Sequence, residues 1–379
     1  MTLNPEEEVE KVKQYCLIIG SSKALLIAAV LLGVWFEEFN VRQFLSAYAH
    51  WPHSEVPTLS SRLATWDSAH YLILSEQGYY RGSHSCAFFP LWPALMCLAS
   101  GISFGHPVIA SMVLANLLSL AAFWWFWKIV QPTYGAKVSQ DALILLLACP
   151  GSLFFSFSYT ESLFLLLVLV FFWYLRREEY GWPVAVAFLM PLTKAIGVFM
   201  VLPLAWHLYE RKKPMKYWLL LAVPLLGYAS YFGIMHAFTG NAFEGFEAQK
   251  AYPYSPSIKN MFNLGGFFSV LIKVGSLDGM MDSVLDRLFF ILFLALLPAV
   301  WRLNRTWFWF TLAAGMVPAM TSWFMSYRRY AVVCFPLFIV LAQIHQKPER
   351  RWLFWYYVFL LAGVQAWAVT RFVNFYWAG

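Results

Sequence analysis

The feature of this sequence that most limits its fold is a series of apolar stretches long enough to cross a lipid bilayer. A membrane-spanning helix needs about 20 mostly apolar residues to cross roughly 30 Å of hydrocarbon. Stretches of this length occur at residues 16–36, 107–129, 217–238 and 352–370, and so run from one end of the chain to the other. Of the 379 residues, 60% are hydrophobic and 12% charged, too few polar groups to cover a soluble protein. The sequence therefore predicts an all-α transmembrane bundle, with residues 1–379 forming a single integral membrane domain.

Short clusters of basic residues lie between the apolar stretches. Lys and Arg are concentrated near residues 11–13, 128–137, 176–177, 211–216, 302–305 and 347–351. Loops rich in these residues stay on the cytoplasmic side of a membrane. The net charge is +7, but the Lys and Arg residues lie in short clusters between apolar stretches and not along one polar face. This pattern indicates how the helices are oriented in the membrane and argues against a nucleic-acid partner.

The chain must leave the cytoplasm and return between consecutive basic clusters, which predicts about eleven crossings. We expect these helices near residues 16–36, 107–128, 138–157, 161–175, 182–193, 195–210, 215–238, 286–302, 306–325, 329–346 and 352–371. The fifth and sixth are short for full spans, which a water-filled cavity beside them would explain. The apolar stretch at 88–104 would break the alternation if it crossed, so it is expected to lie at the outer surface. Residues 37–106 and 239–285 then form two extracytoplasmic loops, the first carrying interfacial helices.

The N-terminal residues and the cysteines bear on processing and on metal binding. Residues 4–8 read NPEEE, acidic where a cleavable signal peptide is basic, so we expect the first apolar helix to be retained with a cytoplasmic N-terminus. The five cysteines form no CxxC pair, which gives no support for a disulfide framework or a zinc site.

A few ionisable residues lie outside the basic clusters. Such side chains are costly near membrane depth and are therefore candidates for function. On the predicted threading they all fall at the outer ends of helices or in the first outer loop. They are Asp67, His70, His84, Glu161, Lys194, Arg328 and Arg329.

Asp67 follows Trp66, whose indole suits an interfacial depth. One interpretation is structural: Thr65 or Asp67 caps a short helix that runs to about Gln77. The other is chemical: a carboxylate here acts as a general base and takes a proton from an attacking hydroxyl. The two roles are compatible.

The other charged candidates also have structural and functional interpretations. Glu161 is either a capping-turn acid or a ligand for a sugar hydroxyl, a metal or a basic side chain. Lys194 is either a snorkelling side chain or a site residue. Arg328 and Arg329 either contact lipid headgroups or bind the phosphate of a substrate.

A metal site is a weaker hypothesis. His70 and His84 can be combined with Asp67, but their spacing matches no tight ligand motif, so we expect no metal or other cofactor. Aromatic residues near the outer cavity are expected to pack at the membrane interface or to stack on a sugar.

Three ordered motifs surround these candidates. They are Trp66-Asp67 with His70-Tyr71, Gly78-Tyr79 and Phe88-Phe89-Pro90-Leu91 with Pro93; Tyr159-Thr160-Glu161-Ser162-Leu163-Phe164; and Arg329-Tyr330 with Phe335-Pro336-Leu337-Phe338. In this order they resemble the motifs of the GPI mannosyltransferase II (PIG-V) family, including its shorter bacterial relatives, within the GT-C membrane glycosyltransferases. The family usually has an arginine at the position of Lys194, and residues 192–197 are closer to an LTKG-like segment of lipid A aminoarabinose transferases.

The resemblance implies a GT-C-like fold and transfer of a sugar, with inversion, from a polyprenyl-phosphate carrier. It further implies that Asp67 is the general base, that Glu161 is a second acidic site residue, and that Lys194 with Arg328 or Arg329 neutralises the leaving phosphate. The residues expected to contact substrate are Trp66, His70, His84, Tyr159 and Tyr330.

The leading hypothesis is a glycosyltransferase, with mannose as the expected sugar and a lipid or glycan hydroxyl as acceptor. The compact length favours a prokaryotic plasma membrane, with the endoplasmic reticulum as the alternative. Two other classes fit the sequence: a transporter or flippase of a lipid-linked or small polar substrate, and a scaffold subunit. Transporters place charged or broken-helix features near the midplane, whereas the charged candidates here are expected at one end.

Overall fold

The computed structural model describes residues 5–103 and 105–379, and its regular elements are α- and 3₁₀-helices, with one isolated bridge between Ser276 and Ser283. The all-α prediction is therefore confirmed. Asn4, in the acidic N-terminal stretch, and Phe104, at the end of the predicted surface helix, lie outside the described residues.

Five described spans are long and apolar enough to cross a membrane. They are residues 12–36 of α1 (Pro5–Phe36), α6 (Pro107–Ala148), η4 (Met215–Leu221) with α10 (Ala222–Thr239), α13 (Val284–Leu303), and η6 (Pro348–Arg350) with α17 (Arg351–Phe372). A bent pair, α15 (Tyr327–Val333) and α16 (Phe335–Ile344), meets at 74° and makes a sixth if it counts as one span. The protein is thus an integral membrane protein, but the predicted eleven crossings are not confirmed.

The difference arises because several helices of the bundle are shorter than a full span. These are α7 (Glu161–Arg176), α8 (Gly181–Thr193), η3 (Ala195–Met200), α9 (Val201–Glu210) and α14 (Arg305–Thr321). They still belong to the interior, since α7 packs between α6 and α8, and α8 packs against α10.

The long helix α6 contains a reversal at Gly135. This residue has φ 84° and ψ 164°, which is not helical and which glycine adopts without strain. Lys23 of α1 donates to Ser119 Oγ at 3.2 Å and also to Ser156 Oγ at 2.7 Å. Because one side chain reaches Ser119 before Gly135 and Ser156 after it, the chain turns back at Gly135 and returns beside the first limb of α6. The helix predicted at 138–157 is correct only in its first part, since α6 ends at Ala148 and is followed by a short 3₁₀-helix and non-helical residues.

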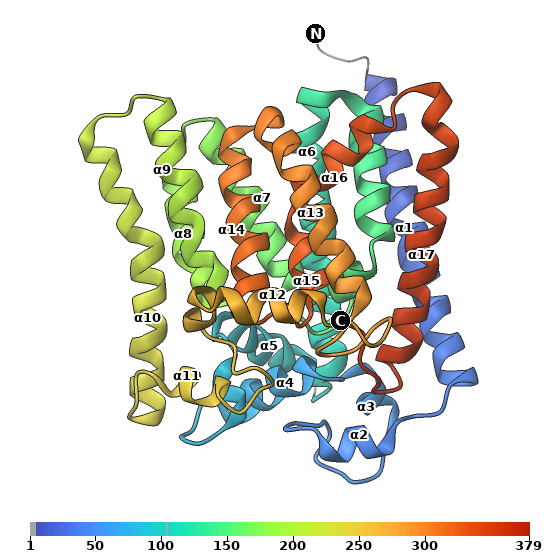
Figure 1. The fold of residues 1–379 in the computed structure, drawn as a ribbon, viewed down its shortest axis with the longest axis vertical. Helices are drawn as coiled ribbons and strands as arrows, with labels where there is room; N and C mark the ends of the chain where they lie inside the picture. The colour runs from blue at the N-terminus through green and yellow to red at the C-terminus, as the bar shows by residue number, and fades with distance from the viewer. Residues whose placement is uncertain (1–4, 104) are drawn as a thin grey trace.

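The two ends of the bundle differ in structure (Figure 1) and in the basic residues of their connections. At the upper end lie short connections that carry basic clusters, including those between α9 and η4, between α13 and α14, and between α16 and α17; we call this the basic end. Ion pairs at this end join two loops, from Lys213 Nζ to Glu178 Oε2 at 2.6 Å, and two helices, from Arg351 Nη1 of α17 to Asp141 Oδ2 of α6 at 2.7 Å.

The opposite end, which we call the site end, carries most of the short helices (Figure 1). They are α2 (Val41–Ser46), α3 (Leu59–Leu63), α4 (Asp67–Gln77), η1 (His84–Ala87), α5 (Leu91–Ile102), α11 (Glu244–Gln249), η5 (Ile258–Phe262) and α12 (Leu264–Ile272). The helix expected at 88–104 corresponds to α5. The 3₁₀-helix η2 (Pro150–Phe155) precedes a buried bend that leads into α7.

Candidate active site

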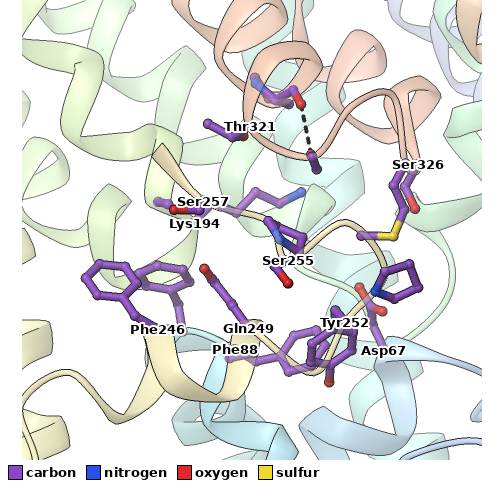
Figure 2. Close-up of a pocket in the computed structure, with 18 of the residues that line it drawn as sticks. Asp67, Phe88, Lys194, Phe246, Gln249, Tyr252, Ser255, Ser257, Thr321 and Ser326 are labelled. Atoms are coloured by element: carbon purple, nitrogen blue, oxygen red, sulfur yellow. Dashed lines mark hydrogen bonds between the residues drawn. The ribbon is translucent and has the colours of Figure 1, made fainter. Parts of the chain in front are cut away.

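A cavity of about 1090 Å³ lies at the site end of the bundle. Its walls come from segments that are far apart in the sequence: the start of α4, the break between α8 and η3, α10, residues 243–260, the end of α14 and the start of α15. Figure 2 shows Phe246 and Asp67 on opposite sides of this cavity, with the segment carrying Ser255 and Ser257 between them in this view. Aromatic residues therefore form part of the cavity wall, and the charged residue Asp67 lies across the cavity from Phe246 in this view.

Asp67 reaches the cavity because the chain turns sharply at Trp66. Trp66 has a positive φ of 53°, which is strained for a bulky residue and is held by its surroundings. Its indole Nε1 donates to the carbonyl of Tyr376 at 3.1 Å, and its ring centroid lies 5.0 Å from that of Phe375 and 5.1 Å from that of Trp377.

The prediction that Thr65 or Asp67 caps this helix is wrong. Trp66 occupies the N-cap position of α4, and no side chain caps the helix. The Asp67 carboxylate instead accepts from Arg329, with Oδ2 and Nη1 2.5 Å apart, and its side chain remains 27% exposed. Asp67 is therefore accessible from the cavity.

Glu161 holds two cations side by side. It is the first residue of α7 and is fully buried, and its Oε1 accepts from Lys194 Nζ at 2.7 Å and from Arg329 Nε at 2.9 Å. Arg329 thus bridges Glu161 and Asp67 and lies over the ring of Tyr159 at 4.6 Å, while Lys194 Nζ lies 5.1 Å from the ring centre of Tyr330. We call Asp67, Glu161, Lys194 and Arg329 the charge cluster.

Lys194 lies at the break between α8 and η3. It follows α8 in an extended conformation, and η3 begins at the next residue. A Cβ on Gly197 would lie 2.4 Å from the carbonyl oxygen of Met190, so only glycine allows η3 to pack this closely on α8. The pair of short helices predicted at 182–193 and 195–210 is present, and residues from the break line the cavity.

Arg328 has a different environment from Arg329, and the structure does not place it with the predicted phosphate-binding group. Its side chain is 1% exposed and does not line the cavity. Asp286 Oδ1 accepts from the Arg328 backbone N–H at 3.0 Å and from its Nε at 3.2 Å, and Asp278 accepts from Nη2. Burial raises the pKa of Asp278 to about 6, although the neighbouring Arg328 lowers it. Arg328 therefore attaches α15 to Asp278 and Asp286, on the side of the helix that does not face the cavity.

Of the two histidines expected to contact substrate, only His70 lines the cavity. His70 lines the cavity, with Nδ1 2.9 Å from Ser85 Oγ and Nε2 3.2 Å from the Tyr252 hydroxyl. Burial lowers the His70 pKa to about 4. His84 lies outside the cavity lining, and its ring centroid is 4.5 Å from that of Tyr48. Within residues 5–103 and 105–379, no three His, Cys, Asp or Glu residues are grouped so that they could hold a metal ion.

The remaining predicted contacts divide between the cavity surface and the layer behind it. Trp66 and Tyr330 line the cavity, whereas Tyr159 is buried behind Arg329 and donates to the carbonyl of Thr65 at 3.1 Å. Sequence reasoning missed Tyr252 as the partner of His70, although it assigned this residue to the outer loop at 239–285. It also missed Lys23, the one basic residue within the apolar stretch 16–36.

The fold and the cluster define a multi-helix integral membrane protein with an acid and two cations facing a cavity at one end. Residues 44–222, a little under half of the chain, match the model of a family described as Mannosyltransferase (PIG-V). The resemblance to the PIG-V family drawn from the motifs is thereby confirmed, and over this range the chain is similar to a mannosyltransferase family. The matched range includes Asp67, Glu161 and Lys194, while Arg329 lies beyond it.

Comparison with solved structures gives matches at low sequence identity. The crystal structure of the Archaeoglobus fulgidus oligosaccharyltransferase complex with zinc and sulfate aligns with a TM-score of 0.44 at 12% identity, over 94% of this chain and 53% of that one. The chain therefore spans about half the length of this structure. No curated protein sequence matches the chain.

Proposed function

We propose that the protein transfers a hexose, with mannose as the expected sugar, from a polyprenyl-phosphate donor to an acceptor hydroxyl, with inversion at the anomeric carbon. The observation that carries this proposal is the joint placement of Asp67, Lys194 and Arg329 on one cavity that also has an aromatic wall. The family match to mannosyltransferases over residues 44–222 supports the sugar class.

The proposed reaction assigns a separate task to each member of the charge cluster. The acceptor oxygen attacks the anomeric carbon while Asp67 takes the hydroxyl proton, and the bond between that carbon and the phosphate oxygen breaks. The departing phosphate gains one negative charge, which Arg329 and Lys194 stabilise. Fixed cations in a water-poor site stabilise such developing charge strongly.

Glu161 acts indirectly in this proposal. The sequence suggested a second acidic site residue, but a fully buried carboxylate that already accepts from Lys194 and Arg329 has no surface to offer a sugar. We assign it the task of holding the two cations together. Phosphate binding is assigned to Lys194 and Arg329 without Arg328, and no cofactor is needed.

The aromatic wall suits the lipid part of the donor. Phe199, Tyr228, Phe232, Phe243 and Phe246 line the cavity. Phe246 lies across the cavity from Asp67 in Figure 2. Phe243 and Phe246 are exposed, and an isoprenoid chain would cover such apolar surface favourably. A donor bound in this way would place its phosphate toward the two cations.

We also propose how the protein is oriented in the membrane. The basic clusters gather at the end opposite the cavity, and the positive-inside bias assigns that end to the cytoplasm. The N-terminus is then cytoplasmic, residues 37–106 and 239–285 are extracytoplasmic, and the reaction takes place on the outer face of what we take to be a prokaryotic plasma membrane.

Release of polyprenyl phosphate tests the proposal. Purified protein is incubated with a panel of labelled polyprenyl-phosphate sugars and with candidate acceptors, and we expect D67N to fold normally and to lose transfer by at least about 1000-fold. D141N is the control, because Asp141 is likewise a carboxylate paired with an arginine, but it is buried at the basic end, away from the cavity. Normal turnover by D67N would refute the assigned base, and substrate movement without polyprenyl phosphate release would favour a transporter.

A further inference from the structure

A lysine of the first transmembrane helix contacts the bend that precedes α7. Lys23 lies near the middle of the span at 12–36, and its Nζ donates to Ser156 Oγ at 2.7 Å, to Ser119 Oγ at 3.2 Å and to the carbonyl of Phe155 at 3.3 Å. All three partners are neutral oxygens. A charged side chain at this depth is expensive and is retained where it serves function or satisfies buried polar groups.

The bend consists of residues 155–160 and is buried on all sides. Its residues are at most 4% exposed, and the segment between η2 and α7 is not helical. Irregular backbone inside a membrane bundle must find its hydrogen-bond partners within the protein. Lys23 supplies them on one side together with Asn116, whose Nδ2 donates to the carbonyl of Ser156 at 3.0 Å.

The opposite side of the bend is attached to the residues that flank Asp67. The Tyr159 hydroxyl donates to the carbonyl of Thr65 at 3.1 Å, and the Ser68 hydroxyl donates to the carbonyl of Ser158 at 3.3 Å. The bend therefore fixes the chain immediately before and after the turn at Trp66.

The same bend also fixes Glu161. The hydroxyl of Ser162, the next residue, donates to the carbonyl of Phe155 at 3.1 Å, and this carbonyl is also a partner of Lys23. Both carboxylates that hold Arg329 are thus attached to one short segment, and Lys23 is its charged support from α1.

From these contacts we infer that Lys23 is a positioning residue for the charge cluster. Lys23 holds the backbone of the bend in place, and the bend fixes the distance between Asp67 and Glu161. Because Arg329 is hydrogen-bonded to both carboxylates, this distance determines how its guanidinium group is oriented toward the cavity. The inference rests on the proposed function, since the cluster is what it positions. Displacements of about 1 Å in such clusters are enough to slow catalysis about 100-fold.

A double-mutant cycle distinguishes positioning from general support of the fold. K23M is expected to lower kcat about 30-fold in the wild-type background but less than about 3-fold in an E161Q background, because the arrangement that it maintains has already been lost. K23R, which keeps a donor at this position, is expected to recover part of the loss. K212M makes the same chemical change at an exposed site of the basic end and should have the same small effect in both backgrounds.

Equal fold-losses from K23M in the two backgrounds would overturn the inference, as would failure of both K23M and K23R to fold. Binding of polyprenyl phosphate gives a second readout that does not need turnover. If the wild-type protein transfers no sugar, the proposed function fails, and Lys23 is then judged by binding. About tenfold weaker binding by K23M supports positioning, whereas unchanged binding, or no binding by the wild-type protein, overturns it.

Discussion

Arg328 and Arg329 are adjacent in the chain, but their guanidinium groups have different neighbours. Arg329 spans Asp67 and Glu161 and lines the cavity, while Arg328 is enclosed by Asp278 and Asp286. Successive residues of a helix point in directions about 100° apart. One turn of α15 can therefore direct Arg329 to the cavity and Arg328 to the buried acids that stabilise the fold.

Replacing each arginine by lysine should separate these tasks. R329K keeps the charge but cannot donate from two nitrogens in a planar fork, so we expect kcat to fall about 100-fold, equivalent to about 2.7 kcal/mol, with little change in Tm. R328K breaks a buried pairing and should lower Tm while the folded fraction retains its kcat. Turnover and thermal unfolding in detergent measure both effects, and the reverse assignment would contradict the structure.

His70 predicts a dependence of stability on pH. Its pKa is lowered from 6.5 to about 4 by burial, so the folded protein holds the ring neutral while the unfolded chain binds a proton more readily. The contribution of neutral His70 to the free energy of unfolding is therefore fully present above about pH 6.5 and is lost as the pH falls to about 4. The loss amounts to up to about 3 kcal/mol. Thermal unfolding between pH 7 and 4 should show this loss in the wild-type protein and less of it in H70Q.

The effect of Asp278 on the pH dependence of stability is opposite to that of His70, so the two effects must be distinguished by experiment. Its raised pKa of about 6 means that the folded protein takes up a proton before the unfolded chain does, so its contribution to stability increases as the pH falls. The difference between wild-type and H70Q curves isolates the histidine, and curves that stay parallel down to pH 4 would contradict its assigned pKa.

At the scale of the elements, the interruption between α8 and η3 matters as much as the helices beside it. It exposes Lys194 to the cavity, and the close contact of Gly197 with the Met190 carbonyl keeps it narrow. A broken helix inside a membrane bundle is tolerated where it lines a cavity, which is the situation of this pair.

Substituting Gly197 should therefore displace the lysine. In G197A the new methyl group would meet the Met190 backbone at 2.3 to 2.4 Å, so η3 must move away from α8 and carry Lys194 with it. We expect about 10- to 100-fold lower kcat and a lower Tm. G181A is the matched control at the start of α8, where a Cβ meets nothing within 4 Å. Unchanged kinetics in G197A would mean that the break is not held by this contact.

The helices themselves were largely predictable from sequence, because apolar length and polar boundaries are local features. The expected helix at 286–302 is α13 at Val284–Leu303, and the one at 352–371 is α17 at Arg351–Phe372. The different environments of Arg328 and Arg329 were not predictable, since they depend on acids supplied by α4, α7, α13 and the loop before α13. The support of the bend by Lys23 likewise depends on packing between α1, α6 and η2.

Across the whole molecule, polarity is distributed as lipid requires. Glu161 and Arg328 are buried in the bundle, whereas Leu25 of α1 is 67% exposed and Phe359 of α17 is 72% exposed. Such an apolar exterior is stable in hydrocarbon and would aggregate in water. The bundle also has a direction, because its basic loops and its cavity lie at opposite ends (Figure 1).

This polarity predicts which end faces the cytoplasm. In a cysteine-free background, a single cysteine is placed at exposed Arg81 of the site end or at exposed Lys212 of the basic end. A membrane-impermeant maleimide applied to intact cells should label R81C and should reach K212C only after permeabilisation, because basic loops resist translocation. Turnover by both variants shows that the labelled protein is folded. The reverse labelling pattern would place the cavity on the cytoplasmic side, where a donor on the outer leaflet could not reach it.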